Sequence, residues 1–183
     1  MVQPDARSDQ ELIAAINNGD ADAFEALYFR YRRWVAHLAY RFTGDSDAAL
    51  DVLQETFLYF LKKFPGFRLT ANLKTFLYPA VKNLSITALR KRERYQSTEA
   101  EQGRLEQAVA LEDSPSASDA VAQALSGLPE EQREVLVLRF VEDLSLQEIA
   151  EAMDIPLGTV KSRLHNALQT LRTDERTKEL FGR

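Results

Sequence analysis

Hydrogen-bonding side chains gather near the end of the sequence, between residues 159 and 166. They belong to the second of two short helical patterns that a tight turn joins over residues 145–172. This arrangement is typical of a helix-turn-helix, whose second helix enters the DNA major groove. Lysine and arginine can bond guanine edges or phosphates, and asparagine can pair with adenine. We therefore predict a DNA-contacting face formed by Thr159, Lys161, Ser162, Arg163, His165 and Asn166.

Local signals position this face. Ser145 and Glu148 form a capping box, the reciprocal pair that begins a helix. Asp154 occupies the turn, and aspartate is among the few residues that tolerate a left-handed backbone. The alternative, an ordinary solvated helix face, would need capping box, turn and periodicity to coincide by chance. The positions expected to lock the two helices together are Ile149, Ala150, Ile155, Val160 and Leu164.

A second informative stretch is DVLQETFLYFLKKF, residues 51–64. A helix over these residues places four side chains on one face, namely Asp51, Gln54, Glu55 and Leu58. A polar, acidic face with apolar edges is suited to docking a basic partner helix. Taken alone, the stretch would also fit a plain solvated face.

Composition narrows the class of protein. The chain has 183 residues and no cysteine, which excludes disulfides, zinc–thiolate sites and cysteine nucleophiles. No apolar run approaches the ~20 residues of a membrane span, and the first residues lack the apolar stretch of a signal peptide. We therefore expect a soluble, cytoplasmic protein.

The net charge of −5 is unfavourable for a protein that binds DNA by itself, because lysine and arginine contacts to phosphate supply most of the non-specific affinity. The charge is unevenly distributed, however. Basic residues concentrate in 82–94 and 161–172, and acidic residues in 99–119. This pattern predicts two DNA-facing modules that need another component in order to bind.

Apolar residues at three- and four-residue spacing predict four helices within residues 8–94. Ser8 and Glu11 form a capping box for the first, while Gly44 suits the end of the second and Asp45 the start of the third. The third helix is expected to point Leu61 inward.

The fourth of these helices is expected to run from about Asn72 to Arg94, with Pro79 kinking it or marking where its regular part begins. A second helical module is expected from Asp119 onward, with Phe140 in its core. No segment alternates like a strand, so the predicted fold class is all-α, with two small helical domains joined by a flexible acidic linker. The predicted limits are 8–94 and 119–173 for the domains, 95–118 for the linker and 174–183 for a C-terminal tail.

The order of these segments resembles the extracytoplasmic-function group of the sigma-70 family, the promoter-recognition subunits of bacterial RNA polymerase. DVLQETFLYF is similar to the core-binding segment of region two, and LKTFLYPAVKNLSITALRKRER to the following helix, which binds the minus-ten element. The stretch from Gly127 to Arg172 is similar to region four, which reads the minus-thirty-five element. The resemblance covers residues 8–94 and 119–172, and its motifs are specific because of their order and spacing.

The resemblance implies which side chains would act. The clamp helices of the polymerase's largest subunit would be contacted by Asp51, Gln54, Glu55, Phe57 and Leu58. A loop over residues 63–69 would hold a base extruded from the minus-ten element, although core packing is an equal alternative for Phe64 and Phe67. The minus-ten residues would be Lys63, Phe64, Phe67, Lys82, Asn83, Arg90 and Lys91.

Region four would read the minus-thirty-five element through Thr159, Lys161, Ser162, Arg163, His165 and Asn166. The implied partners are core RNA polymerase (its clamp helices and flap), promoter DNA and an anti-sigma factor. The implied function is promoter-specific transcription initiation. The resemblance implies no catalysis by the chain itself, no cofactor, no metal ion and no small-molecule substrate.

The chain departs from the family at several positions. The family usually has tryptophan at the position of Phe76, often a basic residue at Pro79 and commonly an acidic one at Thr87. These differences bear on strand separation and on minus-ten preference. Arginine is common at the position of Asn166 and the position of His165 varies, which bears on the minus-thirty-five sequence that is read.

Other classes of protein fit the residues less well. A two-component transcription factor would need a receiver or ligand domain, and residues 1–94 lack the alternating strands of one. A sigma-like decoy that binds an anti-sigma protein would have no need of the basic residues within 90–94 and 161–163. An enzyme would need an assembled site, which two isolated histidines, no cysteine and no glycine-rich phosphate loop do not supply.

Overall fold

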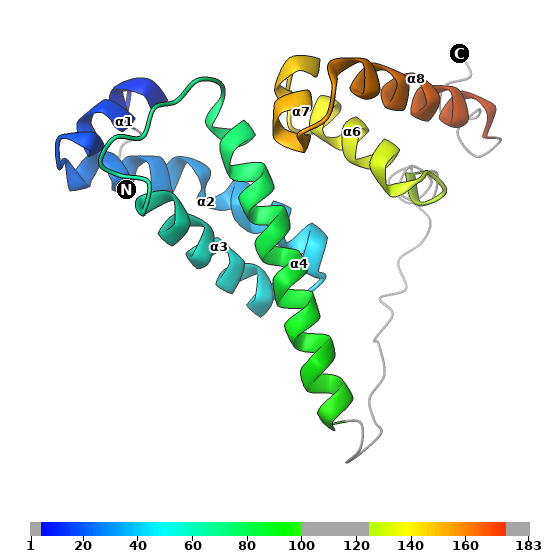
Figure 1. The fold of residues 1–183 in the computed structure, drawn as a ribbon, viewed down its shortest axis with the longest axis horizontal. Helices are drawn as coiled ribbons and strands as arrows, with labels where there is room; N and C mark the ends of the chain where they lie inside the picture. Colours follow the sequence, from blue (N-terminus) through cyan, green and yellow to red (C-terminus); the bar gives the residue numbers. More distant parts are fainter. Residues whose placement is uncertain (1–4, 100–124, 175–183) are drawn as a thin grey trace. The chain divides into compact units, whose positions relative to one another are not determined.

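A computed structural model describes residues 5–99 and 125–174 (Figure 1). Within these residues every regular element is an α-helix, which confirms the predicted fold class. The chain divides into two compact units, Met1–Arg104 and Leu105–Arg183. Most of the predicted linker and tail, residues 100–118 and 175–183, lies outside the described residues. In the described ranges no helix is long and apolar enough to cross a bilayer, and no histidine and carboxylate side chains gather as metal ligands.

The first unit contains helices α1 (Asp9–Asn17), α2 (Ala21–Thr43), α3 (Ser46–Leu61) and α4 (Leu73–Glu99). Side-chain acceptors begin the first three, which confirms the capping box of Ser8 with Glu11 and the N-cap at Asp45. Gly44 ends α2 with φ of 63°, the left-handed conformation that favours glycine.

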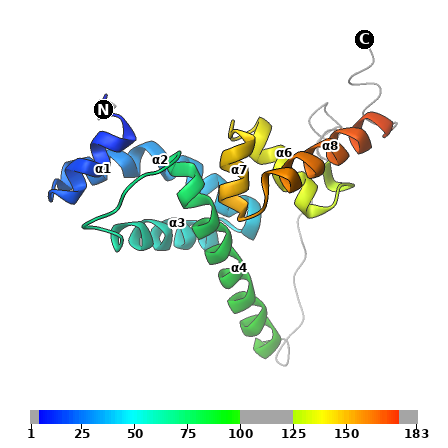
Figure 2. The ribbon, with the colours of Figure 1, turned by 45° about the horizontal axis from the view of Figure 1, so that its top comes forward.

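The core of this unit lies where α2, α3 and α4 pack against one another, with α1 against α2 (Figures 1 and 2). Phe60 of α3 is fully buried. Its ring centre lies 6.2 Å from that of Phe24 on α2 and 5.8 Å from that of Phe76 on α4. The other large side chains that are fully buried in this unit are Leu12, Leu27, Val35, Val52, Leu73, Leu77 and Val81.

Two helices differ from their predicted form. α4 continues through Pro79 and ends at Glu99 rather than at Arg94. Because proline lacks an N–H, the carbonyl of Thr75 loses its usual helical partner, while packing against α2 and α3 maintains the helix. Leu61 was expected inside but is 45% exposed, since it lies on the side of α3 that faces away from Phe60 and the core.

The second unit contains helices α6 (Glu130–Phe140), α7 (Leu146–Met153) and α8 (Leu157–Thr173). The capping box of Ser145 with Glu148 begins α7, and Asp154 ends it with φ of 53° and ψ of 48°. Both observations confirm the predicted helix-turn-helix. Of the five locking positions, Ile149, Ala150 and Val160 are buried, and the other two, Ile155 and Leu164, are half-buried.

The prediction that Phe140 belongs to the core is wrong, because its side chain is 64% exposed. Phe140 is the last residue of α6, and the helical turn directs it away from Val135 and Leu138, which are fully buried. The neighbouring Val141 is exposed as well. The start of the predicted second module, residues 119–124, lies outside the described range.

Phe60→Ala is expected to lower the free energy of unfolding of the first unit by about 3–5 kcal/mol, because it opens a cavity among four neighbouring rings. Phe140→Ala is the matched control, since it removes the same side chain from the surface and should change stability by less than about 0.5 kcal/mol. Urea denaturation followed by circular dichroism measures both changes. Equal losses in the two variants would contradict the assigned burial.

Asp45 is expected to make stability depend on pH. Its carboxylate accepts a hydrogen bond from the N–H of Ala48 and pairs with Arg92 at 2.9 Å, so the pKa of this carboxyl is held below its usual range. Its ionised form therefore stabilises the fold above the unfolded-state pKa of about 4, and this contribution is lost as the pH falls through the folded-state pKa.

Asp45→Asn keeps a capping acceptor and removes the charge. The melting temperature of the wild type should exceed that of Asp45→Asn at pH 7, and the gap should narrow as the pH falls below about 4. Thermal melts followed by circular dichroism across this range measure the gap. A gap that stays constant from pH 7 into acid would sink this prediction.

Candidate nucleic-acid interface

One face of α3 is acidic, polar and exposed. Asp51, Gln54 and Glu55 are all exposed, and Leu58 beside them is 56% exposed. Sequence reasoning missed two exposed leucines on the same side of the helix, because leucine in an amphipathic helix is normally assigned to the core. We call this surface the α3 face, and it consists of Leu50, Asp51, Gln54, Glu55, Leu58 and Leu61.

Phe57 does not belong to the α3 face, which corrects the prediction that it contacts a partner. Its side chain is only 4% exposed. The ring centre lies 4.9 Å from that of Tyr28 and 6.3 Å from that of Phe24, both on α2. Phe57 therefore holds α3 on α2 from the opposite side of the helix.

The loop between α3 and α4, residues 62–72, carries Phe64 and Phe67. Both side chains are half-buried, and their ring centres lie 5.5 Å apart. Each ring packs on Phe60, at 5.2 Å for Phe64 and 5.3 Å for Phe67. Packing against the core, the alternative role of these residues, thus covers part of each ring, and the rest of each ring is accessible to solvent.

Lys63 extends this aromatic surface with a charge. Its Nζ lies 4.4 Å from the ring centre of Tyr59, a cation–π distance. Tyr59 in turn stacks on Phe76 with centres 5.9 Å apart and an interplanar angle of 12°. Aromatic faces beside a lysine can stack bases and attract phosphates.

A cavity of about 480 Å³ opens beside this stack, between α3 and α4. This volume lies within the range of small-ligand pockets. The hydroxyl of Thr75 is buried there without a hydrogen-bond partner among the described residues. The residues that line the cavity are Tyr59, Thr75, Phe76, Pro79, Ala80, Asn83 and Leu84. Of these, sequence reasoning singled out only Asn83, as a DNA-binding residue, and Phe76 and Pro79, as departures from the family.

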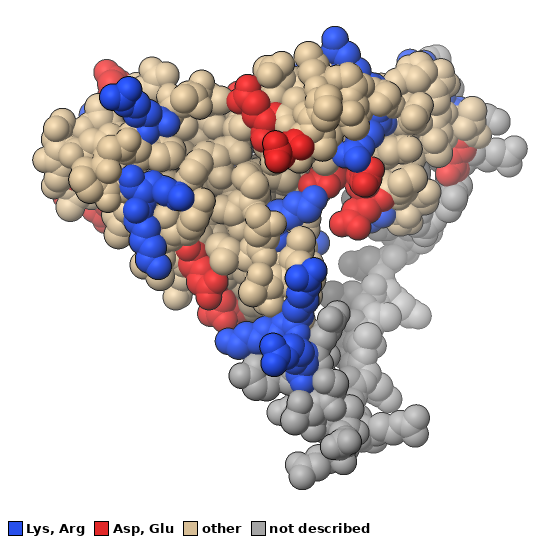
Figure 3. Space-filling view, in the orientation of Figure 1, with Lys and Arg blue, Asp and Glu red and all other residues tan. Residues whose placement is uncertain are grey.

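Basic side chains follow along α4, and Figure 3 shows them gathered toward the end of that helix. Arg90, Lys91 and the amide of Asn83 are exposed, and Lys82 is half-buried. Arg92 pairs with Asp45 at 2.9 Å. The structure therefore places the predicted minus-ten residues within one unit, on the α3–α4 loop and along α4.

The predicted face of α8 is accessible except at its edges. Lys161, Ser162, His165 and Asn166 are exposed, and Thr159 is half-buried. The Ser162 hydroxyl donates to the backbone oxygen of Thr159 at 3.0 Å.

Arg163, by contrast, turns toward α6. Its guanidinium lies 2.5 Å from a carboxylate oxygen of Glu131, and its side chain is 22% exposed. This ion pair joins the first turn of α6 to α8. Arg163 thus supports the position of the recognition helix from within the domain.

Comparisons with known proteins agree with both units. Residues 27–95 match the family model for sigma-70 region 2, and residues 124–173 match that for sigma-70 region 4. The chain is 32% identical over 173 residues to the ECF RNA polymerase sigma factor SigW of Bacillus subtilis, covering 87% of this chain and 92% of SigW. The chain belongs to the extracytoplasmic-function group of the sigma-70 family. This sigma factor directs promoter-specific transcription initiation.

Other relatives extend the same likeness. The ECF RNA polymerase sigma-E factor of Escherichia coli K12 is 31% identical to this sigma factor over 189 residues, covering 96% of this chain and 97% of that protein. Members of this family bind core RNA polymerase and promoter DNA and are not catalytic enzymes.

Solved structures share the fold. CnrH, solved in complex with the cytosolic domain of CnrY, matches 88% of this chain and 93% of its own, with a TM-score of 0.63 and 23% identity. RpoE of Bartonella quintana, solved with the anti-sigma factor NepR, matches 87% of this chain and 96% of its own, with a TM-score of 0.59 and 23% identity. At such identity these matches establish the fold alone.

Glu131→Ala is expected to lower the stability of the second unit by up to about 1 kcal/mol, because the pair with Arg163 is partly solvated. Glu130→Ala, which removes an exposed carboxylate from the same first turn of α6, is the control and should not change promoter binding. Promoter binding by the holoenzyme should weaken in Glu131→Ala if α8 loses its support. Chemical denaturation and DNA-binding titrations measure the two effects, and a more stable Glu131→Ala variant would contradict the pairing.

Proposed function

We propose that this sigma factor docks on core RNA polymerase through the α3 face and reads promoter DNA through two separate surfaces. The observation that carries this proposal is the exposure of carboxylates and leucines together on α3, opposite the buried Phe57. An apolar centre flanked by charge is the usual composition of a protein-binding surface. A basic pair of helices, the clamp helices of the largest subunit, fits this surface. Its contact residues are Asp51, Gln54, Glu55 and Leu58, with Leu50 and Leu61 added.

The minus-ten element is proposed to bind the α3–α4 loop and α4. The accessible parts of Phe64 and Phe67 stack on an extruded base. Extruding the base costs a few kcal/mol of unstacking, and stacking on the two rings offsets this cost. Lys63 and Asn83 hold the strand nearby, because the first extends the aromatic surface and the second lines the cavity. The flanking phosphates bind Lys82, Arg90 and Lys91.

The minus-thirty-five element is proposed to bind the exposed side of α8. Lys161 and Asn166 have the donors for base edges, with Thr159, Ser162 and His165 between them. Arg163 is proposed to hold α8 in position through its ion pair with Glu131, rather than to read a base directly. The polymerase flap binds the same unit. The proposed domains are 8–94 and 119–173, with the linker at 95–118 and the tail at 174–183, and α4 continues through the first five linker residues.

The chain's charge supports dependence on polymerase. With a net charge of −5, the protein gains too little from phosphate contacts to bind promoters by itself. We therefore propose that the protein works in the cytoplasm as a polymerase subunit and catalyses no reaction itself. An anti-sigma factor is proposed as its restraint, since RpoE, which shares the fold, was solved with the anti-sigma factor NepR, and CnrH with the cytosolic domain of CnrY.

The double substitution Gln54→Lys and Glu55→Lys tests the docking surface. It places two positive charges on the α3 face, so binding to a basic partner should weaken by at least about a hundredfold. The control is Glu25→Lys, which changes an exposed carboxylate on α2. Titration of core polymerase with each full-length variant measures affinity, and circular dichroism confirms that the fold is intact.

Transcription from promoter DNA completes the test. The double variant should lose promoter-dependent transcripts in step with core binding, while Glu25→Lys should retain both. If the folded double variant bound core polymerase as tightly as the wild type, the α3 face would not be the docking surface.

A further inference from the structure

The α3–α4 loop, residues 62–72, has very few backbone hydrogen bonds. Its first residues continue the end of α3, with the N–H of Phe64 donating to Leu61 at 3.1 Å. Its last residue, Asn72, accepts from the N–H of Lys74 at 3.0 Å and so begins α4. Between Pro65 and Ala71 the backbone makes two hydrogen bonds within the described chain, and both are with the side chain of Asn17.

Asn17 is the last residue of α1, and its side-chain amide both donates a hydrogen bond to the loop and accepts one from it. Nδ2 donates to the carbonyl of Phe67 at 2.8 Å, and Oδ1 accepts from the N–H of Gly66 at 2.6 Å. Gly66 has φ of 101°, a backbone conformation that residues with a side chain rarely adopt. Glycine adopts it without a steric cost because it has no Cβ. One amide thus binds the two peptide groups that flank the Gly66–Phe67 pair, one before Gly66 and one after Phe67.

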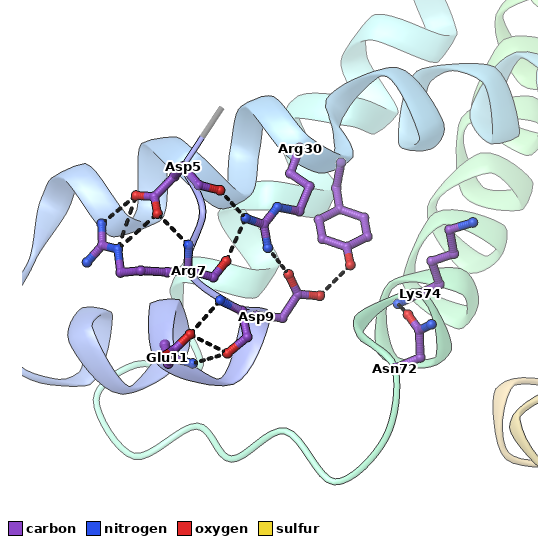
Figure 4. Close-up of polar contacts among 9 residues, drawn as sticks. Asp5, Arg7, Asp9, Glu11, Arg30, Asn72 and Lys74 are labelled. Atoms are coloured by element: carbon purple, nitrogen blue, oxygen red, sulfur yellow. Dashed lines mark hydrogen bonds and ion pairs between the residues drawn. The ribbon is translucent and has the colours of Figure 1, made fainter. Parts of the chain in front are cut away.

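The helix that carries Asn17, α1, is tied to α2 at its first residues (Figure 4). Arg30 of α2 bonds Asp9 at 2.5 Å and also the backbone oxygens of Asp5 and Arg7, at 2.9 and 2.8 Å. Tyr31 of α2 donates to the same Asp9 carboxylate. These bonds tie the start of α1 to α2, and the rest of α1 packs on α2 as well.

We infer that Asn17 is a positioning residue for minus-ten recognition. It sets the backbone of Gly66 and Phe67, and hence the accessible edges of the Phe64 and Phe67 rings, for an extruded base. This inference rests on the proposed role of the loop. Figures 1 and 2 show the loop passing beside α1, as the two hydrogen bonds require.

The chain offers a matched control in the next residue. Asn18 lies at the same end of α1, and its Nδ2 donates to the carbonyl of Ala14 at 3.0 Å, within its own helix. Asn18→Ala removes the same amide without touching the loop. A difference between the two alanine variants therefore reports the loop contact rather than the end of α1.

The experiment uses holoenzyme assembled from core RNA polymerase and the full-length chain. It transcribes a promoter that the wild-type holoenzyme uses, with the minus-ten element randomised in one library and the minus-thirty-five element in another. Transcript sequencing gives base preference at each position. Affinity for core polymerase and the melting temperature are measured on the same variants.

In Asn17→Ala, base preference at one or two minus-ten positions is expected to fall about tenfold, because two hydrogen bonds that order the loop are lost. Minus-thirty-five preference and core affinity should not change. Asn17→Asp keeps the acceptor for Gly66 but places a carboxylate oxygen against the carbonyl of Phe67, so its loss should be at least as large as that of Asn17→Ala. Asn18→Ala should match the wild type in every measurement.

Unchanged minus-ten preference in Asn17→Ala would overturn the inference. So would loss of core binding in both Asn17 variants, because Asn17 would then support the whole domain. Phe67→Leu separates this failure from failure of the proposed function, since it keeps apolar packing and removes the ring. If Phe67→Leu alters minus-ten preference and Asn17→Ala does not, only the role of Asn17 falls; if neither does, the loop is not the DNA reader.

Discussion

The first unit depends on the burial of the Phe60 ring, where three segments of the chain meet. From α3 this ring contacts Phe24 on α2, Phe76 on α4, and both Phe64 and Phe67 on the loop between α3 and α4. Such ring pairs contribute about 0.5–1.5 kcal/mol each beyond the area that they bury. Because one side chain joins the core to the loop, the position of the proposed base-binding rings follows from how the core closes.

The same packing decides which side of α3 is available to a partner. Phe57 and Phe60 occupy the inner side against α2 and α4, so the remaining positions have to face outward. Leucines left on that outer side lose burial unless another protein covers them. The acidic residues among them favour a protein with a basic surface. The proposed docking surface is therefore made of residues that the core cannot use.

Sequence patterns predicted the local parts of this structure well. The capping boxes at Ser8 and Ser145 and the left-handed Asp154 follow from side chains within four residues of one another, where sequence spacing fixes geometry. Family resemblance supplied the candidate site residues, but it assigned Phe57, which is buried, to a surface. That error arose because similarity of position does not reveal whether a side chain points inward.

Long-range contacts were beyond these patterns. Asn17 and Gly66 are separated by 49 residues, and neither belongs to a recognisable motif. Asn17 also precedes residue 27, where the match to sigma-70 region 2 begins. Its relevance depends on α1 lying beside the loop, which only the packing of α1 on α2 establishes.

Two of the predicted departures from the family lie close together in the structure. Phe76 and Pro79, where relatives usually have tryptophan and often a basic residue, both line the cavity between α3 and α4. Pro79 also removes the helical partner of the Thr75 carbonyl, and the Thr75 hydroxyl in the cavity has no partner among the described residues. A buried hydroxyl is costly to leave unsatisfied, so a residue of the cavity lining carries an unpaired polar atom. Whatever the two departures change in promoter recognition, they change it at one place, directly beside the stacked pair of Tyr59 and Phe76.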